Sequence, residues 1–397
     1  MSLHDKPLDH LAPDDVLALR ELETREGLRI EYKECLPGPT DSDKKEFLAD
    51  VSSFANAAGG DLLYGVREKR DADGKSTGIP DEFPGLGEIN LDAVHQRLES
   101  IIQAGLAPRV LGLKFHSVPV LSDSSLLIIR VPRSWSGPHM ICYQDWCRFY
   151  SRNSSGKYLL DVDELRRAFL RTEASSQYVR RWQAQRLGNI VAGETPVSLP
   201  EGPKIILHVV PVAAVDRSAA VDISPVVQNP GMLRPTYSGG WNDRLNLDGL
   251  VTFTGPNPDN GLCINYTQLF RNGAVEAVTT SHLNTGTHQV FPVYEERLIE
   301  ALRRYLELEE LLGVAPPVAL MVSLVGVKGY RMGLPPQYSQ AMFGGIDRDM
   351  VVGSEVLIES MGTDPIQALR PCFDAIWNAC GYPHSANYTA DGQWKGI

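Results

Sequence analysis

The chain has 397 residues, of which 43% are hydrophobic, a formal net charge of −11 and six cysteines. This length and apolar content predict two or three globular domains with substantial cores. The cysteines form neither a Cys-x-x-Cys pair nor a group with histidine, which argues against a zinc site and a disulfide framework. With no basic n-region before an apolar stretch and no run of ~18 apolar residues, we expect a cytoplasmic protein without a membrane partner.

The first half of the chain predicts alternating helices and strands. A helix is expected over 13–23 and a stronger one over 43–58, where apolar residues recur at helical spacing and Gly59-Gly60 follows. Asp43 and Glu46 resemble a capping box for this helix. The other expected elements are a strand at 62–66, a hairpin over 67–79 turning at Asp73-Gly74, a helix at 91–104, strands at 110–115, 126–131 and 147–150, and a helix from 162 to about 187.

The second half also mixes both kinds of element. Strands are expected at 205–212, 249–253, 266–270, 275–280 and 318–327, with helices at 295–312 and 365–379. A proline-rich segment, 194–203, is typical of an exposed linker. The sequence therefore predicts an α+β protein: a tail (1–12), a first mixed domain (13–172), a helix end and linker (173–203) and a second mixed domain (204–397).

Charge is unevenly distributed along the chain. An overall excess of acids argues against binding nucleic acid by bulk electrostatics, because phosphate contacts require lysine and arginine. Between Arg130 and Arg186, however, eleven basic residues stand against five acidic ones. This segment predicts a locally basic surface in an acidic protein.

A polar cluster precedes the helix at 43–58. Glu26, Glu31 and Lys33 lie within eight residues of one another. Carboxylates of this kind can hold Mg²⁺ or Mn²⁺ against a phosphodiester, while a lysine steadies the phosphate. The alternative is that Glu31 and Lys33, as alternate residues of an exposed strand, form a surface salt bridge that contributes little.

These residues and the segments after them together resemble the AlbA-type domain of Schlafen proteins. The resemblance covers roughly residues 13–172 and rests mainly on Glu26-x4-Glu31-Tyr32-Lys33 and on Phe54-Ala55-Asn56-x-x-Gly59-Gly60 before a strand. Later segments agree with it: Asp73-Gly74, Gly78-Ile79, Val131-Pro132-Arg133-Ser134, Gly137-Pro138-His139 and Phe149-Tyr150-Ser151-Arg152. The resemblance implies nucleic-acid binding, to DNA or RNA.

In some animal Schlafen proteins this domain is an RNA nuclease with three acids. The resemblance assigns Glu26 and Glu31 to the first two acids and Lys33 to the neighbouring lysine. The third is normally an aspartate shortly after the Gly-Val of the strand, whereas here Arg67-Glu68 follows, so Glu68 would have to serve. Possible stand-ins are Asp61, Asp71 and Asp73. Glu26, Glu31 and Glu68 are thus the expected metal ligands of a nuclease.

A second candidate site follows the strand at 147–150. Arg148, Arg152 and Lys157 are interleaved with aromatic residues such as Tyr150, a pattern that could grip phosphates and stack a base. The alternative is a strand whose alternate residues are simply solvated. Asp73-Gly74-Lys75-Ser76-Thr77 lacks the first glycine of a P-loop, so no ATP site is expected.

Three functions remain open from the sequence. The first is a nucleic-acid-binding protein whose C-terminal domain provides partner binding or self-association. The second is a metal-dependent ribonuclease or deoxyribonuclease that uses Glu26, Glu31 and Glu68. The third is a regulatory or scaffold protein that binds another protein through its acidic surface.

Overall fold

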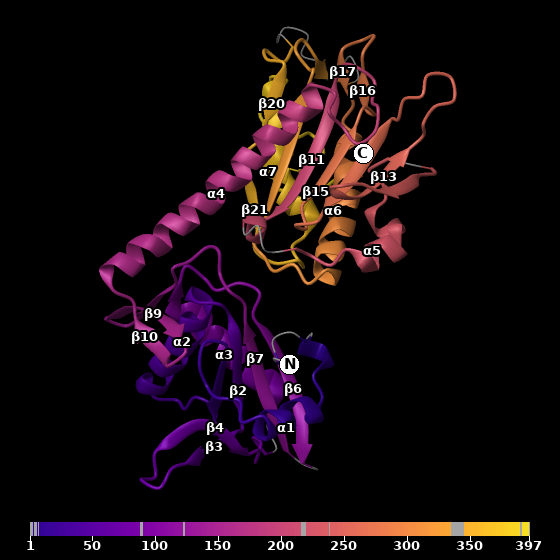
Figure 1. Cartoon of the computed structure of the whole chain (residues 1–397). Coiled ribbons are helices and arrows are strands. Elements are labelled where there is room, and N and C mark those ends of the chain that lie inside the picture. The colour runs from indigo at the N-terminus through magenta and orange to yellow at the C-terminus, as the bar shows by residue number, and fades with distance from the viewer. Residues whose placement is uncertain are drawn as a thin grey trace. The chain divides into compact units, whose positions relative to one another are not determined.

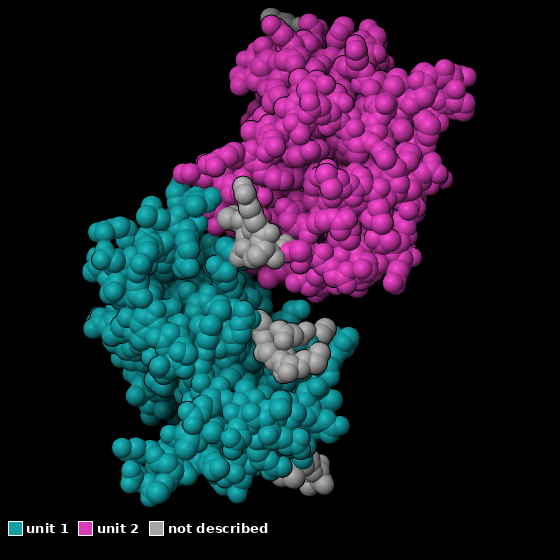
Figure 2. All heavy atoms as spheres, in the orientation of Figure 1, with its two compact units in different colours: residues 1–174 teal, residues 175–397 magenta. Residues whose placement is uncertain are grey.

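The computed structural model divides the chain into two compact units, residues 1–174 and 175–397 (Figure 1; Figure 2). It describes residues 3, 6, 8–87, 90–121, 124–215, 220–237, 239–334, 345–389 and 391–396. Both units contain helices and sheets, which confirms the predicted α+β class.

Unit 1 is built on two sheets, with strand orders β1-β2-β7-β6 and β10-β9-β8-β5, and on a separate hairpin, β3–β4. Strand β1 runs parallel to β2, and the other pairs are antiparallel. The helices of unit 1 are η2 (Leu8–His10), α1 (Pro13–Glu21), α2 (Asp41–Asn56) and α3 (Leu91–Gly105), and α4 (Val162–Val191) begins in it. Its strands are β1 (Ile30–Lys33), β2 (Gly60–Tyr64), β3 (Arg67–Arg70), β4 (Ser76–Glu82), β5 (Leu106–Ala107), β6 (Lys114–Leu121), β7 (Ser124–Val131), β8 (Met140–Tyr143), β9 (Trp146–Asn153) and β10 (Gly156–Leu159).

The first sheet of unit 1 is covered on both faces, because successive side chains of a strand point to opposite sides. Leu62 and Tyr64 of β2 pack with α2 and α3, whereas Leu63 between them packs with α1. Strand β7 alternates in the same way, with Ile129 on the α2 side and Ile128 on the α1 side. This sandwich explains why β2 and β7 are continuous apolar runs.

Local sequence sets both ends of α2. Thr40 is the N-cap: its hydroxyl accepts from Asp43 N–H, and the Asp43 carboxylate accepts in return from Thr40 N–H, at 3.2 Å each. At the other end, Asn56 donates from Nδ2 to the carbonyls of His139 and Tyr150 at 2.9 and 2.8 Å. It also accepts from His139 N–H at 2.7 Å. The asparagine of the Phe-Ala-Asn motif therefore joins α2 to β9 and to the start of β8.

Unit 2 is an antiparallel sheet in the order β12-β13-β14-β15-β11-β18-β20, with β21 also pairing with β18, beside a small sheet β16-β17-β19. The helices are η3 (Val212–Val215), α5 (Ser224–Gln228), η4 (Pro230–Leu233), α6 (Tyr294–Leu311) and α7 (Pro365–Ala379). The strands are β11 (Lys204–Pro211), β12 (Asn242–Leu245), β13 (Gly249–Thr254), β14 (Asn265–Phe270), β15 (Val275–Thr279), β16 (Leu283–Asn284), β17 (Gln289–Val290), β18 (Val318–Val325), β19 (Arg331–Met332), β20 (Met350–Val352) and β21 (Val356–Ile358). Helices α6 and α7 bury one face of the sheet.

The second half of α4 packs on the other face of this sheet. Leu187 and Ile190 of α4 are buried there together with Val197. Arg186 donates two hydrogen bonds to Glu276 of β15, at 2.9 and 2.8 Å. His208 of β11 and Tyr266 of β14 also contact this carboxylate, at 3.0 and 2.7 Å. Although burial opposes ionisation, the hydrogen bonds from Arg186 and His208 lower the pKa of Glu276 to about 2.

Several predicted boundaries differ from the structure. The units divide between Ala174 and Ser175, within α4 and two residues after the expected end of the first domain. Part of the expected helix end and linker, 173–203, packs on the second sheet, where Leu187, Ile190 and Val197 are buried. In the expected tail, Leu3, Leu8 and Leu11 are buried, while residues 1, 2, 4, 5 and 7 lie outside the described part of the chain. The strand expected at 110–115 is β6, which begins at Lys114. Thr40, and not Asp43, caps α2.

Within the described residues, every helix is too short or too polar to cross a bilayer.

The close approach of two backbone segments at Gly59 can be tested by substitution. Gly59 has a φ of +72°, and a Cβ there would lie 2.6 Å from Arg133 N and 2.9 Å from Val131 O. Gly74 has a similar φ, +76°, but open space around it. We predict that Gly59→Ala lowers the free energy of unfolding by about 3 kcal/mol or more, whereas Gly74→Ala costs about 1 kcal/mol, the conformational term alone. Urea denaturation measures both, and equal losses would contradict the close approach at Gly59.

Candidate functional site: a buried network of ion pairs

Six charged side chains from four elements meet in unit 1. We call this group the ion-pair network: Glu31 and Lys33 of β1, Glu46 and Asp50 of α2, Arg152 of β9 and Lys157 of β10. Its three carboxylates balance its three cations. Glu31, Asp50 and Arg152 are buried, and Lys33 and Lys157 are partly buried.

The secondary structure determines which residues meet. Glu31 and Lys33 are alternate residues of β1 and share one of its faces. Glu46 and Asp50 are four residues apart in α2 and share a face of that helix. Arg152 and Lys157 are direct partners in the register of β9 and β10. The two residues from β1, the two from α2 and the two from the β9–β10 hairpin therefore meet in the ion-pair network.

Glu31 is held by two cations. Its Oε1 accepts from Lys33 Nζ at 2.7 Å, and its Oε2 accepts from Arg152 Nη2. Burial raises the pKa of Glu31, but the charges and hydrogen bonds of Arg152 and Lys33 lower it by more. The pKa of Glu31 is therefore below its ordinary value, and the carboxylate is ionised. The Glu31–Lys33 pair is consequently part of a buried network and not the surface salt bridge considered as the alternative.

Asp50 forms the second half of the network. Lys157 Nζ lies 2.8 Å and Lys33 Nζ 3.6 Å from its carboxylate, and Arg152 Nη1 lies 3.9 Å away. Burial raises the pKa of Asp50, and Lys157 and Lys33 oppose that rise. Sequence reasoning missed Asp50. The signal was present, because Asp50 lies three residues after Phe47 and four before Phe54 on the apolar face of α2.

Glu26 and Glu68 lie beside the network and are joined through Gly78. Glu26 N–H donates to Gly78 O at 2.7 Å, and Gly78 N–H donates to Glu68 Oε2 at 2.9 Å. Glu26 Oε1 accepts from Tyr32 N–H at 2.6 Å. Burial, and then repulsion from Glu31 and Glu68, raise the pKa of Glu26 to about 7. Glu68 has a raised pKa too, mainly through burial. The structure therefore brings the three predicted acids into electrostatic contact.

These acids do not fit a divalent cation as they stand. Both oxygens of Glu31 are used by Lys33 and Arg152, and one oxygen of Glu68 is used inside the hairpin by Gly78 and Ser76. Among the described residues, no group of three or more acidic, histidine or cysteine side chains is placed to hold a metal ion.

Two of the three stand-in acids are engaged elsewhere, and the third is exposed. Asp61 is buried against Arg130 at 2.7 Å. Asp71 accepts from Asp73 N–H and Lys75 N–H in the β3–β4 turn, both at 2.9 Å, and Asp73 lies at the exposed tip of that turn.

The four residues predicted to contact nucleic acid have different surroundings. The Arg152 side chain is fully buried, donates to Gly27 O at 3.0 Å and lies over the Phe54 ring at 4.2 Å. Lys157 is paired with Glu46 and Asp50. Tyr150 packs against the core and against Trp146 at 6.0 Å. Among these four, Arg148 is the exposed side chain, and the other three are partly or fully buried.

The basic segment between Arg130 and Arg186 is basic in sequence but largely neutralised in space. Arg130, Arg152 and Arg186 all pair with acids that come from outside the segment, namely Asp61, Glu31 and Glu276. A count of charged residues along one segment of the sequence does not include acids from other parts of the chain that pair with its bases.

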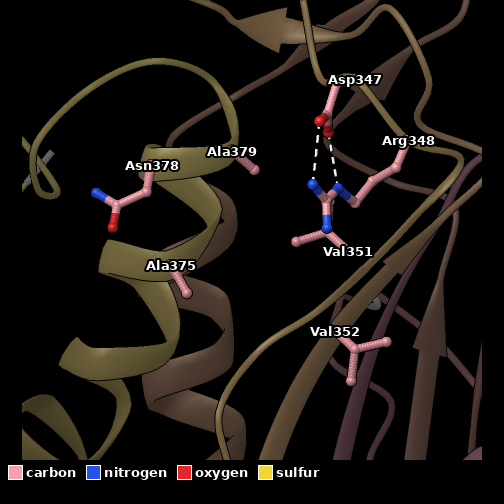
Figure 3. A pocket seen from close by; sticks show the side chains of 7 residues that line it. All are labelled: Asp347, Arg348, Val351, Val352, Ala375, Asn378 and Ala379. Atoms are coloured by element: carbon pink, nitrogen blue, oxygen red, sulfur yellow. Dashed lines mark hydrogen bonds and ion pairs between the residues drawn. The ribbon is translucent and has the colours of Figure 1, made fainter.

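A pocket of about 310 Å³ lies in unit 2 (Figure 3). It is lined by Asp347, Arg348, Val351, Val352, Ala375, Asn378 and Ala379. Arg348 points at Asp347 and donates to both of its oxygens, at 2.7 and 3.0 Å. The charged lining residues are thus paired with each other, and the other lining groups are apolar or uncharged.

Comparison with known proteins identifies the first part of the chain. Residues 26–161 match the family model described as Schlafen, AlbA_2. The N-terminal part of this protein is therefore a Schlafen AlbA-type domain, as the sequence motifs predicted.

Two solved structures are also similar to the chain. One is the N-terminal domain of a protein from Nitrosomonas europaea related to the ATP-dependent DNA helicase RecG: identity is 26%, over 31% of this chain and 74% of that one, with a TM-score of 0.24. The other is the DIP2311 protein from Corynebacterium diphtheriae, 15% identical over 37% of this chain, with a TM-score of 0.23. This second match spans only 27% of the DIP2311 chain. Among curated proteins, none matches.

The ion-pair network predicts that two arginines of β9 contribute very differently to the free energy of unfolding. Replacing Arg152 with alanine leaves Glu31 and Asp50 buried with one cation fewer, so we expect a loss of about 3 to 5 kcal/mol in the free energy of unfolding. Arg148→Ala removes an exposed arginine nearer to the β8–β9 turn on the same face of the strand and should change stability by less than about 0.5 kcal/mol. Chemical denaturation of both variants measures this, and a loss below about 1 kcal/mol for Arg152→Ala would refute a buried pair.

The raised pKa of Glu26 predicts how the stability of the fold changes with pH. Its folded pKa, about 7, lies above its ordinary value of 4.5, so the folded state binds this proton more tightly than the unfolded state. Stability from this group is present below pH 4.5 and is lost as the pH rises through 7. Glu26→Gln, which still accepts from Tyr32 N–H, should match the parent near pH 4 and exceed it by about 1 kcal/mol at pH 8, with allowance for solvent screening. Denaturation curves across this range provide the measurement, and a constant difference would count against a raised pKa.

Proposed function

We propose that unit 1 binds nucleic acid and does so without metal-assisted cleavage. The observation that carries the proposal is the match of residues 26–161 to the Schlafen AlbA_2 family. The state of Glu31 supports the second part, since Lys33 and Arg152 take the two oxygens that a metal ion would need. DNA and RNA are both kept as candidate ligands.

The β3–β4 hairpin is the surface we assign to phosphate contact. It extends from the body of unit 1 (Figure 1) and carries the exposed cations Lys69, Arg70 and Lys75. A fourth, Arg67, is paired with Glu34 and Glu82. The hairpin is ordered by its own contacts: Arg70 Nη1 donates to Gly74 O at 2.8 Å, and Asp71 ties the turn. Gly78 of β4 accepts from Glu26 N–H and donates to Glu68 of β3, so it joins the hairpin to Glu26. The hairpin also carries exposed acids such as Asp71 and Asp73, so the proposal rests on its individual cations and not on a net positive charge. A projecting hairpin with exposed cations suits a groove or a single strand.

For unit 2 we retain the proposal of partner binding or self-association, and for the whole chain the proposal of a cytoplasmic location. The acidic net charge of −11 is what favours a protein partner as a second candidate function.

Binding is tested by fluorescence anisotropy with labelled single-stranded RNA, single-stranded DNA and duplex DNA. We expect affinity that falls steeply between about 50 and 200 mM salt, because each phosphate contact releases counterions. The variant Lys69→Ala/Arg70→Ala/Lys75→Ala should bind more weakly and reduce the salt slope by about 0.7 to 0.9 for each phosphate that the variant no longer neutralises. Arg303→Ala/Lys328→Ala/Arg331→Ala removes three exposed cations from unit 2 and serves as the control of equal charge.

Each outcome of this assay decides one point. Retained binding in the hairpin variant would move the nucleic-acid interface away from β3–β4, with Arg148→Ala as the next variant. No binding of any ligand at low salt would overturn the proposal and leave the protein-binding candidate. Incubation of the same ligands with Mg²⁺ or Mn²⁺ tests cleavage: cutting by the parent that Glu68→Gln abolishes and Asp73→Asn leaves intact would establish a nuclease instead.

A further inference from the structure

Cys142 and Cys147 face each other across the β8–β9 hairpin. They are direct partners in its register, one pair away from the turn. The turn has two residues, Gln144 and Asp145, and is closed by the pair Tyr143 and Trp146. In such a hairpin the closing pair exchanges hydrogen bonds and the next pair does not, and Cα atoms of a non-hydrogen-bonded pair are about 4.5 Å apart. That separation lies within the span that a disulfide bridges, about 4.4 to 6.8 Å.

The two thiols are close together and within reach of solvent. Burial, and then the neighbouring Cys147 thiol, raise the pKa of Cys142. Cys147 is exposed and Cys142 partly so. Among the other four cysteines, Cys263, Cys372 and Cys380 are buried and Cys35 is exposed. The hairpin pair thus combines the accessibility and the proximity that thiol exchange requires.

The hairpin is anchored, so the thiols stay opposite each other. Tyr143 Oη and Gln144 Nε2 donate to the two oxygens of Asp41 at the start of α2, at 2.9 and 2.7 Å. Lys45 of α2 lies over the Trp146 ring at 5.7 Å. Because contacts on both sides of the turn hold this backbone to α2, a bond between the two sulfur atoms needs no rearrangement of the sheet.

We propose that Cys142 and Cys147 are a redox site that forms a reversible cross-strand disulfide with low-molecular-weight disulfides as the oxidant. The exposed Cys147 thiolate attacks one sulfur of the small disulfide, breaks its S–S bond and releases the first thiol. The Cys142 sulfur then attacks Cys147 in this mixed disulfide and releases the second thiol. The two protons of the cysteines end on the two released thiols, so the protein loses two electrons and the small disulfide gains them.

The test uses the full chain equilibrated with mixtures of reduced and oxidised glutathione, then alkylated and digested with trypsin. Cleavage after Arg133 and Arg148 places both cysteines, and no other, in the peptide 134–148. We expect this peptide to carry neither alkyl groups nor glutathione and to be about 2 Da, the mass of two hydrogens, lighter than the unmodified dithiol peptide. A peptide that keeps two alkylated thiols, or that carries glutathione without an internal bond, would overturn the proposal.

Two variants and one unfolded control complete the test. Cys142→Ser should leave glutathione attached to Cys147, because the resolving thiol is missing, whereas Cys35→Ser should leave the internal disulfide unchanged. The short spacing alone favours some closure in an unfolded chain. We therefore expect the equilibrium constant for closure to be at least about tenfold larger in folded than in urea-unfolded protein. Equal constants would show that the hairpin contributes nothing and would refute the site as a property of the fold.

Discussion

Two carboxylates buried in unit 1, Glu31 and Asp50, impose a constraint on everything around them. Removing a charge from water is expensive unless cations and hydrogen bonds replace the solvent. The chain meets this requirement with Lys33 from the same strand as Glu31 and with Arg152 and Lys157 from a hairpin more than a hundred residues later. Strands β9 and β10 must therefore pair in one register, because a shift by one residue would turn one of the two cations away from these acids.

The pairing of Glu31 with two cations also limits its use as a metal ligand. A nuclease of this architecture needs carboxylates free to bind a metal ion, and the acids nearest to that role, Glu26 and Glu68, lie next to a network in which Glu31 is already neutralised. Stability of the domain and a metal site at Glu31 are thus competing uses of one side chain. In this chain the cations supplied by β9 and β10 favour stability. The exposed cations proposed to contact a polyanion lie instead on the projecting hairpin, outside the ion-pair network.

Much of this architecture could be predicted from the sequence, and the exceptions share a cause. Helices α2 and α7 and strands β2, β7 and β18 were predicted to within a few residues, because periodicity, caps and glycines are local signals. The family of unit 1 was predicted from residues that its fold requires, such as Asn56 and Gly59. Arg152 was placed on the surface although it is buried, and Asp50 was missed. Arg152 pairs with Glu31 and Asp50 only in the folded chain, where residues distant in sequence come together. The cysteine pair was missed for a related reason: a spacing of five has no meaning until the turn between them is known.

The packing of α4 on the sheet of unit 2 has a practical consequence for dividing the protein. A fragment that starts at the apparent domain boundary, residue 204, would lack Arg186, Leu187 and Ile190. Glu276 would then remain beside His208 and Tyr266 without its arginine, and an apolar face of β11, β14 and β15 would lose its cover. A fragment that starts near residue 175 keeps both. The proline-rich segment is thus a poor place to cut, although it has the composition of a linker.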